Sequence, residues 1–219
     1  GLRRAAGGVC AILREAGVST RLEELFAPAF VGHDLFETAK RDHGAVQSEL
    51  VEFTLARLKA QLQGEGLSAG CVDAVFAAGL SSDVVDIAAR SHALGRQAAL
   101  PEFEDLRVAF KRVMGLTKDH SDETCTPQHF ESPTEHALYA ALEGVRAEAE
   151  AAAESKDYDR ALALMSQLKA PVDAFFEAVL VMCEDETVRL NRLGLLYSIA
   201  NLFRMVADFT RFTGEGDRR

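Results

Sequence analysis

The sequence predicts an all-α protein, in which a multi-helix array precedes a C-terminal helical bundle. Alanine, leucine, arginine and glutamate, which favour helices, are abundant, and alternating segments of valine, isoleucine and threonine are nearly absent. Apolar residues recur at helical spacing, as at Val46, Leu50, Phe53, Leu58 and Leu62. With 48% hydrophobic residues, a chain of 219 residues can bury a substantial core, as one domain or two small ones.

Glycine and proline divide the first half of the chain into helices. A helix over residues 2–16 is expected to end at Gly17, and a second over residues 20–27 is expected to end at Pro28. Pro101 suits the first turn of a helix, where a missing N–H is tolerated. The other helices of this half are predicted over residues 45–63, 68–78, 81–98 and 101–117.

The second half begins with a polar segment and a clear helix start. Residues 118–130 lack helical periodicity and contain a proline, so they are predicted to be a linker or exposed loop. Ser132 can cap the free amides of a helix, Pro133 occupies its first turn, and Glu135 completes a capping box. This helix should run to about Glu154. Further helices are predicted over residues 157–169, 171–183 and 185 to about 212.

Composition restricts the function classes. The net charge is −10, of which residues 1–120 carry −2 and residues 121–219 carry −8. This charge disfavours nonspecific binding to nucleic acid, although a local basic patch can still engage RNA. No apolar run approaches the roughly 20 residues that span a bilayer, and no charged-then-apolar leader is present, so we expect a soluble cytoplasmic protein. Because the first residue is glycine, we expect a piece of a longer protein.

The cysteines and histidines do not predict a metal site. The four cysteines are more than fifty residues apart and form no C-x-x-C pair, so reduced buried thiols are expected, with Cys183 in the core. His33-Asp34 is typical of metal phosphohydrolases, but a convincing set of further ligands is absent, even with Asp42 and His43 nearby. Three more histidines lie near Cys125 without zinc-site spacing, namely His120, His129 and His136.

Two motifs near the C-terminus resemble a known family. Residues 171–176 have the sequence P-V-D-A-F-F, and residues 184–196 have the sequence E-D-E-T-V-R-L-N-R-L-G-L-L. They resemble the end of the bacterial glycyl-tRNA synthetase β subunit, where P-V-D-x-F-F precedes E-D-x-x-x-R-x-N-R-L-x-L-L. The last ten or so residues of that pattern are typical of the DALR-type anticodon-binding helical domain.

Earlier segments resemble the same family, and Gly115 stands where the family pattern leads us to expect an asparagine. The resemblance implies three parts: the end of an HD-like helical domain over residues 1–45, a helical connector over 46–120, and a DALR-type bundle over 121–219. The matching segments have the sequences L-R-R-A-A (residues 2–6), F-T-L-A-R-L-K (53–59), V-D-A-V (72–75) and A-F-K-R-V (109–113).

The resemblance implies recognition of tRNA, and the basic residues of the motif are its first candidates. Arg189 and Arg192 are three residues apart and project to one helix face, with Arg204 and Arg211 on or near the same sector. Guanidinium groups bind phosphates and stack on unstacked bases. The alternative is that these arginines pair with nearby carboxylates. Asn191 either contacts a base or serves as a buried anchor between helices.

A second basic cluster and two aromatic residues are further candidates. Lys111 and Arg112, with Arg107 and Lys118, can track an RNA backbone or simply form a solvated face. Phe175 and Phe176 can stack on a base, but core packing fits their apolar surroundings better. Asp173 is expected to cap or bridge helices.

The sequence predicts no catalytic residue in this chain. It contains no glycine-rich phosphate loop, no G-x-S-x-G and none of the class I synthetase motifs. The family resemblance implies that a separate α subunit makes glycyl-adenylate with ATP and magnesium, while the β chain holds tRNA specific for glycine. The expected partners are therefore that tRNA and the α subunit, with no cofactor and no membrane.

Three alternatives remain open. The bundle could belong to another synthetase with a DALR domain, such as the arginyl or cysteinyl enzyme. The acidic second half could instead make the chain a helical protein-interaction or subunit-docking module. A nuclease or phosphohydrolase using His33 and Asp34 is the most distant possibility.

Overall fold

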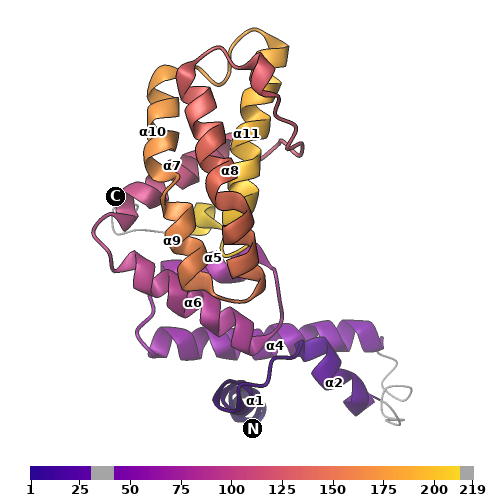
Figure 1. Ribbon diagram of the computed structural model, residues 1–219. Helices are drawn as coiled ribbons and strands as arrows, with labels where there is room; N and C mark the ends of the chain where they lie inside the picture. The colour runs from indigo at the N-terminus through magenta and orange to yellow at the C-terminus, as the bar shows by residue number, and fades with distance from the viewer. Residues whose placement is uncertain (31–41, 213–219) are drawn as a thin grey trace, which may run out of the picture.

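The computed structural model describes residues 1–30 and 42–212, and within these ranges every regular element is a helix (Figure 1). This confirms the predicted fold class. The first half contains α1 (Leu2–Ala16), α2 (Leu22–Phe30), α4 (His43–Gly64), α5 (Ala69–Ala78) and α6 (Val84–Ala98). The first half also contains α7 (Phe103–Leu116), and the second half contains η1 (Pro127–His129), α8 (Pro133–Glu154), α9 (Tyr158–Ser166), α10 (Lys169–Ala178), α11 (Glu186–Arg204) and η2 (Phe209–Arg211).

Helices α8, α9, α10 and α11 form a bundle, and helices α1, α2 and α4 lie beneath it and are called the base. In Figure 1, α8 and α11 stand side by side, α10 lies above α9 next to α8, and α4 lies across the lower part of the molecule with α1 and α2 below it. Helices α8 and α11 both begin at the upper end of the bundle, and α10 ends there. The connection from α10 to α11 therefore crosses that end.

Local signals explain most helix ends. Gly17 adopts the left-handed conformation (φ 64°) and ends α1, because glycine enters this region without a Cβ clash. Ser132 and Glu135 form the predicted capping box of α8, and the Asp185 side chain caps α11. Helix α2 continues to Phe30 with Pro28 inside it, so the prediction that Pro28 ends this helix is wrong.

Helices α10 and α11 are shorter than predicted because tertiary contacts redirect the chain. After α11 ends at Arg204, the Asp208 N–H donates to the Ala74 carbonyl (2.9 Å), and the buried Phe209 ring contacts Phe203, with 5.4 Å between centroids. After α10 ends at Ala178, the chain is extended at Val179. The predicted helix ends at residues 183 and 212 are therefore wrong.

The core is continuous across both halves. Phe110 of α7 stacks on Phe203 of α11, with 3.6 Å between ring centroids, so α7 packs against the bundle. The division into parts at residues 45 and 120 stays a prediction. None of the helices in the described ranges has the length and apolar character that crossing a lipid bilayer requires.

Polar contacts of α6 also join the base to the bundle. Asp86 accepts a hydrogen bond from the Tyr158 hydroxyl of α9 and pairs with Arg90 (3.0 Å), which in turn donates to the Met205 carbonyl. The Lys156 ammonium contacts Asp83 (3.3 Å). Burial and the bond to Asp86 raise the pKa of Tyr158, which therefore stays a neutral donor. We call these contacts the α6 junction.

Candidate functional site

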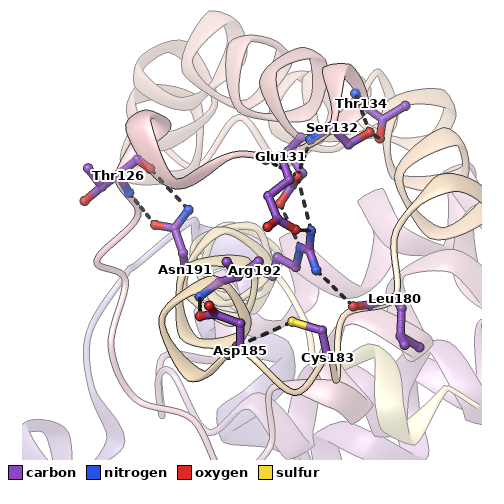
Figure 2. Close-up of polar contacts among 11 residues, drawn as sticks. Thr126, Glu131, Ser132, Thr134, Leu180, Cys183, Asp185, Asn191 and Arg192 are labelled. Atoms are coloured by element: carbon purple, nitrogen blue, oxygen red, sulfur yellow. Dashed lines mark hydrogen bonds and ion pairs between the residues drawn. The ribbon is translucent and has the colours of Figure 1, made fainter.

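The motif residues of α11 lie at the upper end of the bundle, and Arg192 is at their centre (Figure 2). Its Nε lies 2.8 Å from Oε1 of Glu135 in the first turn of α8. One terminal nitrogen donates to Glu131 (2.9 Å) and the other to the Leu180 carbonyl (3.2 Å). The Arg192 side chain is 7% exposed. Arg192 therefore holds three segments together through a largely buried side chain, and its direct contact with tRNA stays a prediction.

Glu135 is the buried partner that makes this arrangement stable. Its side chain is fully buried, and Oε2 accepts hydrogen bonds from the backbone N–H groups of Ser132 (2.7 Å) and Glu131 (2.8 Å). Burial alone would raise the pKa of Glu135, but the bonds from Arg192 and the two amides outweigh it and lower the pKa. The carboxylate is thus ionised opposite Arg192 at neutral pH.

Asn191 is a buried anchor. Its Oδ1 accepts from the Thr126 N–H (2.6 Å), and its Nδ2 donates to the Thr126 carbonyl (3.2 Å; Figure 2). Both backbone groups of Thr126 are therefore satisfied by one side chain. Of the two roles considered for Asn191, the geometry fits the anchor and leaves its amide engaged rather than available to a base.

The segment before η1 lies along α11, although it was predicted to be a linker or exposed loop. A Cβ on Gly194 would lie 2.1 Å from the Thr124 carbonyl oxygen, so only glycine allows this approach. The Asn201 amide donates to the Glu123 carboxylate (2.5 Å), and the Ser198 hydroxyl reaches the Glu123 carbonyl (3.5 Å). Residues 191, 194, 198 and 201 form one face of α11, and this segment covers it.

Arg189 closes the turn that leads into α11. One terminal nitrogen donates to the Cys183 carbonyl (2.8 Å) and the Glu184 carbonyl (3.3 Å), while Arg189 itself stays half-buried. Cys183 is partly exposed beside the Asp185 carbonyl, so the prediction that it lies in the core is wrong. The non-helical connection after α10, with a turn at residues 181–182, leaves Cys183 partly exposed.

The late arginines do not gather on one face. Arg204 lies fifteen residues after Arg189 on α11, about 22 Å along the axis at 1.5 Å per residue. Its guanidinium lies 5.4 Å from the Tyr197 ring centroid and donates to Asn201 (2.9 Å). Arg211 lies beyond the helix, in η2. The prediction that Arg211 shares a helical sector with the other three arginines is therefore wrong, because α11 ends at Arg204.

The second basic cluster is divided between buried and exposed residues. Arg107 is buried, pairs with Glu104 (2.6 Å) and donates to the Phe212 carbonyl (3.2 Å). Lys111 is half-buried, whereas Arg112 is exposed and its guanidinium carbon lies 3.9 Å from the Phe176 ring centroid. Of the six residues predicted to contact tRNA, Arg112 is thus the one classed as exposed.

The P-V-D-A-F-F motif contributes mainly to the core. Phe175 is fully buried, as expected from its apolar surroundings, while Phe176 is half-buried beneath Arg112. Asp173 pairs with Lys169 four residues earlier (2.8 Å), so it neither caps nor bridges helices as predicted. Leu180 and Met182 follow the motif and are strongly exposed.

Within residues 1–30 and 42–212, no group of three or more histidine, cysteine, aspartate or glutamate side chains could hold a metal ion. His33 and Asp34 lie outside the described residues, while Asp42 caps α4 through the Ala45 N–H (2.8 Å). Burial and the nearby Glu135 raise the pKa of Cys125 to about 11, so this thiol is protonated and a poor ligand.

Three functional features escaped the sequence analysis. Glu135 was predicted only as a cap. Its pairing with Arg192 was missed because the two residues lie far apart in the sequence. The close approach at Gly194 had one signal, a glycine within the apolar run that follows Arg192. The exposure of Leu180 and Met182 had none, because an apolar run predicts burial.

Comparison with known proteins identifies relatives of both halves. Residues 107–209 match the family described as the DALR anticodon-binding domain, and residues 1–77 match the glycyl-tRNA synthetase beta subunit family. The chain is 37% identical over 211 residues to the glycine–tRNA ligase beta subunit of Desulforudis audaxviator, covering 96% of this chain and 30% of the relative. It is 38% identical over 214 residues to the same subunit of Desulforamulus reducens, covering 98% and 31%. The chain thus spans about 30% of the length of these relatives.

Proposed function

Because the chain belongs to the glycyl-tRNA synthetase β-subunit family and carries a DALR anticodon-binding domain, we propose that its bundle binds the anticodon arm of tRNA specific for glycine. The observation that carries this proposal is the family match over residues 107–209, which begins within α7 and ends at the first residue of η2. Because the matched residues coincide with the bundle, the match supports tRNA binding by the bundle rather than by the base.

The side chains proposed for direct contact are the ones that leave charge at the surface. Arg112 is exposed, and Lys111, Arg189 and Arg204 are half-buried. Arg192 and Asn191 are proposed as positioning residues, because their polar groups are engaged with Glu135, Leu180 and Thr126. With −8 on residues 121–219, a few local cations rather than a broad basic surface would bind the RNA.

The chemistry of aminoacylation is proposed to take place outside this chain. No catalytic residue is assigned here, and we propose that ATP and magnesium act at an α subunit that joins glycine to the tRNA. In this arrangement the β chain works in the cytoplasm, where the anticodon arm is held while the acceptor end reaches the α subunit.

The acidic surface supports a second candidate function, docking of the α subunit. The late arginines are spread along α11 or paired, so their pattern no longer favours RNA. The net charge of the second half suits a basic protein partner. Anticodon recognition remains the stronger proposal because the DALR match covers the whole bundle.

Binding of the chain to glycine tRNA, measured beside the same tRNA with altered anticodon bases at several salt concentrations, tests the proposal. A preference for the native anticodon, with affinity that falls as salt rises, is expected. Arg189→Ala should weaken binding, whereas Arg4→Ala on α1 is a matched control with an exposed arginine far along the chain. Equal weak binding to both tRNAs would contradict the proposal and favour the docking function.

A further inference from the structure

A cavity of about 540 Å³ lies between α7, α10 and the segment 179–182 that follows α10. Arg112 and Leu116 of α7, Phe176 of α10, and Leu180 and Met182 of the segment are among the residues that line it. We call it the Arg112 pocket. Its volume is within the range of small-ligand sites in proteins.

Most of the side chains that line the Arg112 pocket are apolar, Glu177 is also among them, and the pocket is open to solvent. Leu180 is 73% exposed and Met182 is 58% exposed, while the alternating neighbours Val179 and Val181 are buried. The chain is extended at Val179 and turns at residues 181–182. Two adjacent exposed apolar side chains beside a cavity are typical of a binding surface.

The pocket also carries an uncompensated cation. The Arg112 guanidinium lies over the Phe176 ring at 3.9 Å, and Phe176 meets the buried Phe175 edge-on, with 5.5 Å between centroids. In the part of the chain that the structure describes, no carboxylate forms an ion pair with Arg112. The guanidinium carbon lies over the Phe176 ring, and the Arg112 residue is exposed to solvent.

The rim of the pocket is held by the motif arginines. Arg192 donates to the Leu180 carbonyl (3.2 Å), and Arg189 donates to the Cys183 carbonyl (2.8 Å), directly after Met182. These bonds fix the segment between α10 and α11 before any ligand arrives. A segment that is already ordered lowers the entropic cost of binding. Arg189 and Arg192 would therefore favour ligand binding without contacting the ligand.

We propose that the Arg112 pocket binds one unpaired base of the tRNA, stacked on the outer face of the Arg112 guanidinium and flanked by Leu180 and Met182. Unpaired bases stack on guanidinium planes and aromatic rings, and the free N–H groups of arginine can reach base acceptors or a phosphate. An apolar protein helix would instead bury the cation without a partner, which is costly. This inference rests on the proposed function and names its contact site.

The test uses an RNA hairpin with the sequence of the glycine tRNA anticodon arm, carrying a fluorescent adenine analogue at one loop position at a time. Stacking of the analogue should quench its fluorescence on binding to the unmodified chain. Arg112→Lys keeps the charge but loses the planar face, and Phe176→Leu keeps apolar volume but loses the ring. Each should abolish the quenching at one position and weaken binding by about 5- to 150-fold.

A matched control comes from a second arginine–phenylalanine pair. Arg57 lies 5.5 Å from the Phe53 ring centroid on α4, so Arg57→Lys makes the same exchange elsewhere. It should leave hairpin binding and quenching unchanged. Thermal unfolding followed by circular dichroism shows whether each variant is folded. If Phe176→Leu does not fold, Arg112→Lys alone tests the inference, because Arg112 is exposed and its substitution leaves the core unchanged.

The outcomes separate this inference from the proposed function. Hairpin binding at unmodified affinity by both pocket variants would overturn the inference and leave anticodon-arm binding intact. Absence of hairpin binding by the unmodified chain would contradict both. Loss of α-subunit association in the variants, with hairpin binding unchanged, would also overturn the inference by making the pocket a protein-docking site.

Discussion

Arg192 of α11 and Glu135 of α8 form a buried ion pair, with 2.8 Å between Nε and Oε1, that joins the second turn of α11 to the first turn of α8. The same guanidinium reaches the carbonyl of Leu180, so one side chain fixes the entrance of α8, the start of α11 and the segment between α10 and α11. The motif that resembles an RNA-binding sequence thus first builds the end of the bundle.

Removing one partner of this pair should strongly destabilise the chain. Arg192→Ala leaves the buried Glu135 carboxylate without its cation, and we expect a loss of about 3–5 kcal/mol in unfolding free energy, measured by urea denaturation. Arg160→Ala, which breaks the exposed Arg160–Glu148 pair, is the matched control and should cost about 0–1 kcal/mol. Equal small losses in both variants would show that the buried pair does not stabilise the fold.

The same pair predicts a pH dependence of stability. The pKa of Glu135 is lowered from its ordinary value of 4.5 in the folded chain, so the unfolded state binds this proton more readily. The contribution of Glu135 is therefore complete above pH 4.5 and is lost as the pH falls through the lowered pKa. The difference in unfolding free energy between the unmodified chain and Glu135→Gln should be constant from neutral pH to 4.5 and shrink below it. A difference that already vanishes near neutral pH would contradict this assignment.

Gly194 should not tolerate alanine. Its Cβ would overlap the Thr124 carbonyl, so Gly194→Ala must displace the segment that covers α11, at a cost of about 1–3 kcal/mol. Gly144 in α8 is the matched control, because it is exposed and a Cβ there meets no atom within 4 Å. Gly144→Ala should stabilise the helix by about 1 kcal/mol. Thermal unfolding of the two variants should therefore shift in opposite directions.

Asn191 predicts a specific pattern of amide protection. Asn191→Leu removes both hydrogen bonds to Thr126, so the Thr126 amide should exchange with solvent much faster than in the unmodified chain. The Thr124 amide, which bonds Asp122 within the same segment (2.8 Å), should keep its rate. Hydrogen exchange followed by NMR measures both, and unchanged protection of Thr126 would exclude the anchoring role.

The helices could be predicted from sequence where their ends depend on local chemistry. The left-handed Gly17 and the Ser132 capping box act within a few residues, so their patterns were sufficient. The end of α11 could not be predicted, because it depends on the bond from Asp208 to Ala74, far away in sequence. The same limit applied to the site: helical spacing places Arg189 and Arg192 on one face but does not show that Glu135 covers it.

The α6 junction has a consequence for how this chain can be divided. The family match begins at residue 107, yet Tyr158 of the bundle depends on Asp86 of α6 and Arg90 reaches back to Met205. A chain truncated to residues 107–209 would lose the acceptor for a buried phenol and expose the apolar underside of α9. We therefore expect the boundary of sequence similarity not to be a boundary of cooperative unfolding, and we expect α6 to unfold together with the bundle.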